Sequence, residues 1–179
     1  MYKKLIPLIQ FLPLSLFSTY GFWQNQASNE RWIEAFQLAA LLGILQLVIM
    51  LFQRNPVNRL ILATNLYLIF GGVAAFFQQW WYLEIYQSLQ ESAIFIFMIA
   101  VGVITTLASP SGYIATRNLP KNAHIWASWT LLFASIFAFL NANALQGQIM
   151  YSVVIPIISL SVLQRFLSFR LINVQKKCD

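Results

Sequence analysis

The residues best placed to do chemistry form a polar series beside an apolar segment: Glu84, Gln87, Ser88 and Glu91. Residues three, four and seven positions after the first lie on one face of an α-helix. Inside a membrane, unpaired ionisable groups are costly and often mark a binding site or a proton path. We therefore expect this face either to line a polar cavity or to be the water-facing end of a span.

A second polar pair, Glu34 and Gln37, lies on an earlier apolar segment and also has helical spacing. If the first series lines a cavity and is not simply the wet end of a span, this pair would share that cavity near the outer leaflet, and Arg31 could neutralise a carboxylate there. Such a cavity could bind a polar headgroup or relay protons.

Other groupings that carry chemistry are missing from the sequence. His124 is the only histidine, Cys178 the only cysteine, and Asp179 the only aspartate. There is no glycine-rich phosphate loop and no set of ligands with zinc-type spacing. We expect a protein that is not an enzyme and that holds no metal ion or cofactor.

The segments that must position these residues are apolar. The chain is 59% hydrophobic and 9% charged, with a mean hydropathy of +0.67, whereas a soluble domain has roughly a quarter of its residues charged. A helix needs about 20 apolar residues to cross a hydrocarbon core of roughly 30 Å. We therefore expect an all-α polytopic membrane protein, with one transmembrane helical domain over residues 1–179. It would be a bundle of about six transmembrane helices, with spans near 5–23, 31–52, 60–77, 89–108, 125–140 and 149–169.

Two of these spans, 60–77 and 89–108, are expected to form a helical hairpin around a short, tryptophan-rich turn. The first span is expected to be kinked, because Pro7 and Pro13 each remove a backbone donor. It either crosses the membrane fully or re-enters on the same side, packed on protein.

Basic residues predict the orientation. If the amino terminus is cytoplasmic, ten of the eleven Lys and Arg residues lie on the inner side, and only Arg31 lies outside. This asymmetry follows the positive-inside rule, so both termini should be cytoplasmic. The net charge of +6 is spread over span ends and forms no stripe, which favours a lipid bilayer partner over nucleic acid. A cytoplasmic cluster closes the chain and either anchors the topology or binds anionic lipid or an acidic partner; its members are Arg165, Arg170, Lys176 and Lys177.

Small residues predict close helix packing at Gly71, Gly72 and Ala75. The fourth span offers Ala93, Ala100 and Gly102 as possible partners. The alternative is a flexible point at a ligand site or pore.

Two deeper polar residues, Gln46 and Asn65, are expected to make hydrogen bonds between helices. Pro156 is expected to kink the last span, with Ser159 and Ser161 as hydroxyl partners. The alternative for these positions is a solute path or a broken helix at a binding site.

Several short apolar motifs occur in a characteristic order: Phe11-Leu12-Pro13-Leu14, Leu66 to Phe70 followed by Gly71-Gly72, Tyr82-Leu83, and Trp129 with Phe133 and Asn141. In order and spacing, over almost the whole length, the chain resembles the intracellular septation protein A family of bacterial inner-membrane proteins. It departs from that family after the Phe-Gly-Gly helix, where an acidic turn and lysines are replaced by Gln78-Gln79-Trp80-Trp81 and Glu84.

The resemblance implies a non-catalytic protein of the bacterial inner (cytoplasmic) membrane, active in cell-envelope maintenance and in cell division or septation. It would act through other membrane proteins or as a homo-oligomer. An accessory subunit of a larger membrane complex fits the same residues. The residues also leave open a small transporter or lipid-handling protein, lined by the polar face described above.

Overall fold

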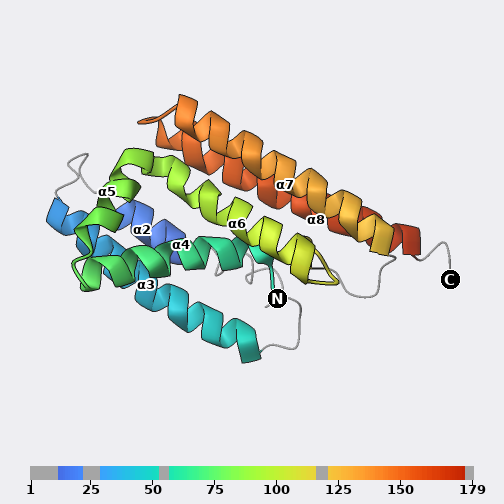
Figure 1. Ribbon diagram of the computed structural model, residues 1–179, viewed down its shortest axis with the longest axis horizontal. Coiled ribbons are helices and arrows are strands. Elements are labelled where there is room, and N and C mark those ends of the chain that lie inside the picture. Colours follow the sequence, from blue (N-terminus) through green and yellow to red (C-terminus); the bar gives the residue numbers. More distant parts are fainter. Residues whose placement is uncertain (1–11, 22–28, 53–56, 116–120, 176–179) are drawn as a thin grey trace. The chain divides into compact units, whose positions relative to one another are not determined.

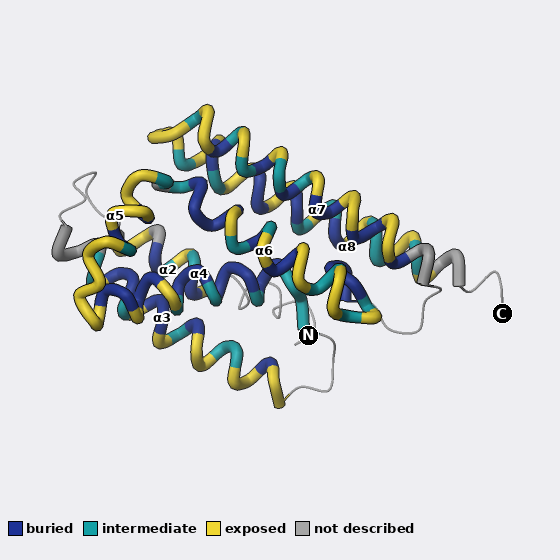
Figure 2. The backbone as a smooth tube through the Cα atoms, in the orientation of Figure 1, coloured by how far each residue is buried: buried dark blue, intermediate teal, exposed yellow. Residues whose placement is uncertain are grey.

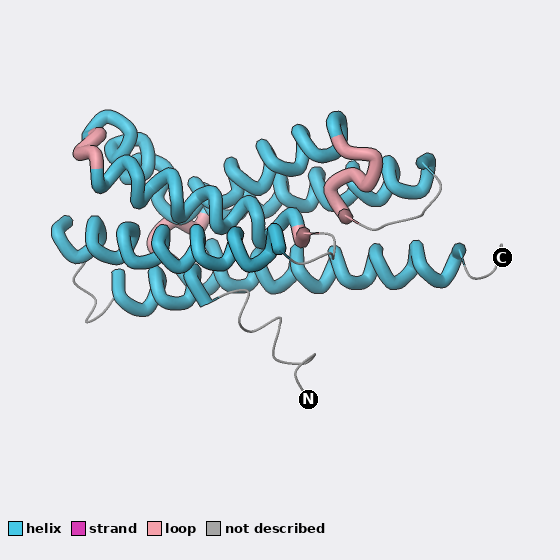
Figure 3. Tube along the Cα trace, turned by 90° about the horizontal axis from the view of Figure 1, so that it is seen from below, coloured by secondary structure: helices cyan, strands magenta, loops and turns pink. Residues whose placement is uncertain are grey.

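The computed structural model describes residues 12–21, 29–52, 57–115 and 121–175. They form a succession of helices (Figures 1 and 3), and no strand occurs among them. The elements are α2 (Leu12–Gly21), α3 (Asn29–Phe52), α4 (Arg59–Phe76), α5 (Trp80–Leu89), the 3₁₀ turn η3 (Gln90–Ser92), α6 (Ala93–Ala108), α7 (Lys121–Ala144), the π-helical segment η4 (Met150–Val154) and α8 (Ile155–Gln175). The predicted all-α class is confirmed.

Four helical segments are long and apolar enough to cross a membrane: Ile33–Phe52, Arg59–Phe76, His124–Ala144 and Met150–Ile172. A fifth is obtained if α5 and α6, which are bent at the break between them, count as one span. These helices are those of an all-α membrane protein. Within the described residues, the expected first span is represented only by the ten residues of α2. Pro7 lies outside the described residues, and Pro13 is the second residue of α2. The kink of the first span and the total of six spans stay predictions.

The expected turn between the third and fourth spans is largely helical. Helix α5 begins at Trp80, two residues after the chain reverses at Gln78, whose φ is +53°. The 3₁₀ turn η3 then separates α5 from α6, so no single straight helix covers the expected span of residues 89–108. The Ser92 hydroxyl donates to the Leu89 carbonyl at 2.6 Å, which satisfies a carbonyl at this break.

The described helices divide into two compact units. One contains residues 1–55 and 64–88, and so holds α2, α3, most of α4 and α5; the other contains residues 56–63 and 89–179, and so holds the start of α4 and all later helices. The expectation of one domain over the whole chain stays a prediction.

In the first unit, α3 and α4 approach closely at two adjacent glycines. A Cβ atom at Gly71 would lie 2.5 Å from the Phe36 ring, and one at Gly72 would collide with Ala40 and lie 2.8 Å from the Phe36 carbonyl oxygen. The glycines are therefore where the backbone of α4 approaches α3, as the small-residue pattern predicts for one helix face. The residues that a Cβ atom at either glycine would meet belong to α3.

The same unit holds a buried aromatic cluster. The Phe17 and Phe36 rings lie 4.5 Å apart, and the Tyr67 and Tyr86 rings stack at 5.2 Å with an interplanar angle of 13°. Tyr86 also donates its hydroxyl to the Tyr67 carbonyl at 3.2 Å. The cluster joins α2, α3, α4 and α5 around the glycine contact, and Ala75 packs next to Leu83 in the adjoining core.

In the second unit, α7 and α8 lie side by side (Figure 1) and α6 packs on α7. Gly102 is the close-contact residue of α6, because a Cβ atom there would lie 2.9 Å from both Leu132 and the Tyr113 ring. Ala100 is exposed, and Ala93 is buried. Buried positions follow one side of each of these helices, while their other sides are exposed (Figure 2), as expected of helices that face lipid.

Replacing Gly72 by alanine is expected to destabilise the protein by about 1–3 kcal/mol, because the new methyl group would have to displace the α3 backbone. Gly43→Ala on α3 is the matched control, since its Cβ would meet no atom closer than 3.5 Å. Thermal unfolding in detergent measures both variants. Equal melting temperatures for the two would contradict the close approach at Gly72.

Candidate functional site

The expected polar face on α5 is interrupted. Glu84, Gln87 and Ser88 are exposed on α5, where the Ser88 hydroxyl donates to the Ile85 carbonyl at 2.9 Å. Glu91 lies in the following 3₁₀ turn, and its carboxylate accepts a long hydrogen bond, 3.5 Å, from the Gly147 backbone N–H. The helical spacing that places Glu91 on the face of Glu84 does not hold, because the α-helix ends at Leu89.

The other half of the expected cavity lies on α3. Glu34 is exposed, and its carboxylate accepts a hydrogen bond of 2.9 Å from the Tyr20 hydroxyl of α2. Gln37 is half-buried, and the side chain of Arg31 lies outside the described residues. A cavity lined by Thr106, His124 and Ser128, and another lined by Leu12, Ser15 and Tyr20, include no member of the expected polar lining.

The deeper polar residues bond to each other. The Asn65 amide of α4 donates to the Gln46 side-chain oxygen of α3 at 3.0 Å. The predicted hydrogen bond between helices is confirmed, and it joins the two residues that could have continued a polar path into the first unit. Asn65 is buried, so its hydrogen bond to Gln46 lies inside the contact between α3 and α4.

The basic cluster at the end of the chain is described in part. Arg165 and Arg170 are exposed on α8, and the Arg170 guanidinium lies 4.9 Å from the centre of the Phe166 ring, a cation–π distance. Lys176 and Lys177 lie outside the described residues.

The start of the last span contains a feature that the sequence analysis did not anticipate. Pro156 is preceded by the π-helical segment Met150–Val154, in which the Ile155 N–H bonds to the Met150 carbonyl five residues earlier. The Tyr151 carbonyl would then face residue 156, and proline has no N–H to offer. The Asn141 side-chain amide of α7 donates to this carbonyl at 3.1 Å, so a side chain replaces the missing backbone donor.

A second buried polar contact organises the connection between α6 and α7. The Tyr113 N–H donates to the Ser128 hydroxyl oxygen at 2.9 Å, and both residues are fully buried. Gly112 precedes this contact with a φ of +58°, where a Cβ atom would collide with the Ser128 hydroxyl. The connection therefore needs glycine here both for its backbone conformation and for space.

The Tyr113 side chain reaches back to α7. Its hydroxyl lies 3.5 Å from the Ser135 hydroxyl, which gives its own proton to the Leu131 carbonyl at 3.0 Å; Tyr113 is therefore the donor. Burial raises the pKa of the Tyr113 phenol well above its usual value, and the Ser135 bond opposes that shift. The phenol therefore stays neutral, and its contact with Ser135 holds the connecting segment against α7.

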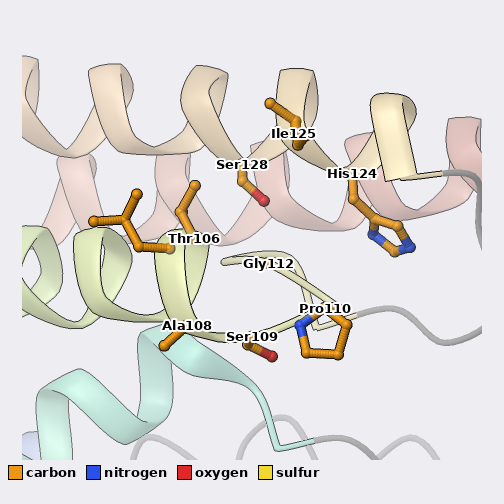
Figure 4. Close-up of a pocket in the computed structure, with 9 residues that line it drawn as sticks. Thr106, Ala108, Ser109, Pro110, Gly112, His124, Ile125 and Ser128 are labelled. Atoms are coloured by element: carbon orange, nitrogen blue, oxygen red, sulfur yellow. The ribbon is translucent and has the colours of Figure 1, made fainter.

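A cavity of about 240 Å³ lies beside this connection (Figure 4). Figure 4 shows the side chains of His124 and Ser128 extending from α7 towards the connecting segment. His124 is 4% exposed. The wall is completed by Thr106, Leu107, Ala108, Ser109, Pro110, Gly112 and Ile125.

The cavity was missed from the sequence, although a signal for it exists. His124 and Ser128 are four residues apart and therefore share a helix face. The spacing of this pair does not indicate which segment packs opposite it on the other side of the cavity. In the structure that segment is the end of α6 and the loop that follows it.

In the part of the chain that the structure describes, no group of three metal-ligating side chains occurs.

Comparison of the chain with family models, with curated proteins and with solved structures gives no match. The resemblance to the septation protein A family therefore stays an interpretation of the motifs.

Asn141→Ala is expected to lower the free energy of unfolding by about 1–3 kcal/mol, because the Tyr151 carbonyl loses its donor. In a Pro156→Ala background the cost should be smaller, since residue 156 then supplies a backbone N–H. A double-mutant cycle on thermal unfolding measures this coupling. Additive effects of the two substitutions would show that Asn141 does not compensate for the proline.

Proposed function

We propose that the chain is a non-catalytic, multi-pass protein of the bacterial inner membrane that acts in cell-envelope maintenance or septation through membrane-protein partners. The observation that supports this most is the absence of a shared polar lining among the described residues. Gln46 and Asn65 bond each other, Glu34 bonds Tyr20, and Glu91 bonds a backbone amide.

The packing of the first unit supports a binding role over transport. A path for a polar solute between α3 and α4 would have to pass the contact of Gly71 and Gly72 with Phe36 and Ala40, where there is no space even for a methyl group. Transport would require these helices to separate, and the aromatic cluster ties α4 to both neighbours.

The outer face of α3 supplies apolar surface for a partner. Exposed large apolar side chains recur three or four residues apart along it, and so form one stripe; they are Leu38, Leu41, Leu45, Ile49 and Phe52. Lipid or the helix of another membrane protein can cover such a stripe.

The proposed topology has six spans, with the segment near residues 5–23 crossing first and both termini in the cytoplasm. It is supported by the distribution of the basic residues, ten of which then lie on the inner side. On this topology, the connection between α6 and α7 and the end of α8 face the cytoplasm.

Deletion of the gene in its bacterial host is expected to produce division or envelope defects that the wild-type chain corrects. The variants Glu34→Gln, Glu84→Gln and Glu91→Gln should correct them equally well, because no proton relay or catalysis is involved. Gly72→Ala should not, because it disturbs the α3–α4 contact. Morphology and envelope-stress reporters measure the outcome, with membrane levels of each variant as the control.

Two outcomes would contradict the proposal. A deletion strain with normal division and a normal envelope would remove the assigned process. A glutamate variant that reaches wild-type membrane levels but fails to complement would show that the carboxylate itself does the work, as expected of a transporter.

A further inference from the structure

The cavity beside the α6–α7 connection lies at the end of two apolar helices of the second unit. Helix α6 ends at Ala108, and the candidate span of α7 begins at His124. Both residues are part of the cavity wall. In a bilayer this position is the boundary between hydrocarbon and headgroups, which is where the phosphates of lipids lie.

Two residues of the cavity wall carry hydroxyl groups that have no acceptor among the described residues. Ser128 is fully buried, and its oxygen accepts the Tyr113 N–H, but no described residue accepts its own hydroxyl proton. Thr106 Oγ1 is buried without a hydrogen-bond partner, whereas Thr105, next to it, bonds the Val101 carbonyl at 2.6 Å. Unused donors in an apolar setting are costly, and a ligand rich in acceptor oxygens would satisfy them.

The local charge favours an anion. The described residues of the cavity wall include no carboxylate, and the sequence has no Asp or Glu between Ser92 and Cys178. Arg117 and Lys121 lie in or next to the connecting segment in sequence. The first turn of α7, which includes His124, adds the positive end of a helix dipole.

The size and the rim decide which anion fits. About 240 Å³ is below the roughly 300–1,000 Å³ of pockets that enclose drug-sized ligands, so the cavity holds a small group and not a whole metabolite. Leu107 and Ile125 line the same cavity and are exposed, at 76% and 48%. They offer apolar contact for the glycerol and acyl parts of a lipid, which a soluble phosphate lacks.

We infer that this cavity binds the phosphate headgroup of a phospholipid, with His124, Ser128 and the first turn of α7 around the phosphate. The site lies apart from the α3–α4 contact on which the proposed function rests, and it does not require that proposal to hold. A lipid held here would fix the end of α6 against the start of α7.

The test uses the full chain in a neutral maltoside detergent, supplied with a phosphatidylglycerol of defined mass. Native mass spectrometry then counts the lipids that stay bound. We expect one phosphatidylglycerol to be retained per chain, and a diacylglycerol with the same acyl chains to be lost. Equal retention of the two lipids would overturn the inference, because the phosphate would then contribute nothing.

Two variants locate the lipid. Ala108→Phe places a ring in the cavity from its exposed rim, without removing any hydrogen bond, and should weaken retention by about tenfold or more. Ala100→Phe is the control, because Ala100 is also exposed on α6 but is not part of the wall. His124→Leu removes a polar group at similar volume and should weaken retention in the same direction.

Retention that is unchanged in Ala108→Phe, or equally reduced in Ala100→Phe, would place the lipid elsewhere and overturn the assignment. Inorganic phosphate at millimolar concentration is the competing ligand. If it displaces the phosphatidylglycerol and protects the chain from thermal unfolding as well as the lipid does, the site takes phosphate from solution and the lipid source is wrong.

Discussion

A helix in hydrocarbon has no water to satisfy its backbone, so each amide and carbonyl must find a partner within the protein. In this chain side chains meet the constraint at two places where the regular helix is interrupted. Asn141 bonds the Tyr151 carbonyl that Pro156 leaves without a donor, and Ser128 accepts the Tyr113 N–H in the loop after α6. These bonds determine which helices lie together: Asn141 ties α7 to the segment that leads into α8, and Ser128 ties α7 to the end of α6.

In the first unit, close packing of α3 on α4 holds the helices together. Lipid is as apolar as the helix surfaces it covers, so helices associate through shape and through hydrogen bonds. Gly71 and Gly72 remove the side chains that would keep α4 from α3, and the Phe36 ring fills the space beside them. The Gln46–Asn65 bond and the aromatic cluster add directional contacts. A contact this tight is suited to a fixed scaffold, and this is why we propose a role in binding partners.

The parts of the structure that depend on composition and periodicity could be predicted from the sequence. Apolar segments of about 20 residues give the helices, a pair of adjacent glycines gives a close contact, and two polar residues deep in apolar helices give a hydrogen bond between them. The partner of the glycines could not be read in this way, because small residues on α3 and α6 are equally suitable and only the fold selects between them.

Features were missed where the regular α-helix is interrupted. The polar face assumed an unbroken helix from Glu84 to Glu91, but the 3₁₀ turn at Gln90–Ser92 shifts the register. The π-helical segment before Pro156 cannot be recognised from the spacing of apolar residues, since it adds only one residue to a turn. The cavity near His124 depends on a loop with a left-handed glycine, and hydropathy says nothing about how such a loop folds back.

The close packing of α3 on α4 leaves no polar path between these two helices. Single cysteines at positions 46, 65 and 87, introduced into a Cys178→Ser background, can be probed with a membrane-impermeant thiol reagent in intact cells. We expect labelling at position 87, which is exposed on α5, and no labelling at 46 or 65. Labelling at position 65 that a polar solute blocks would show that water and solute reach the α3–α4 contact, so that the contact is not dry.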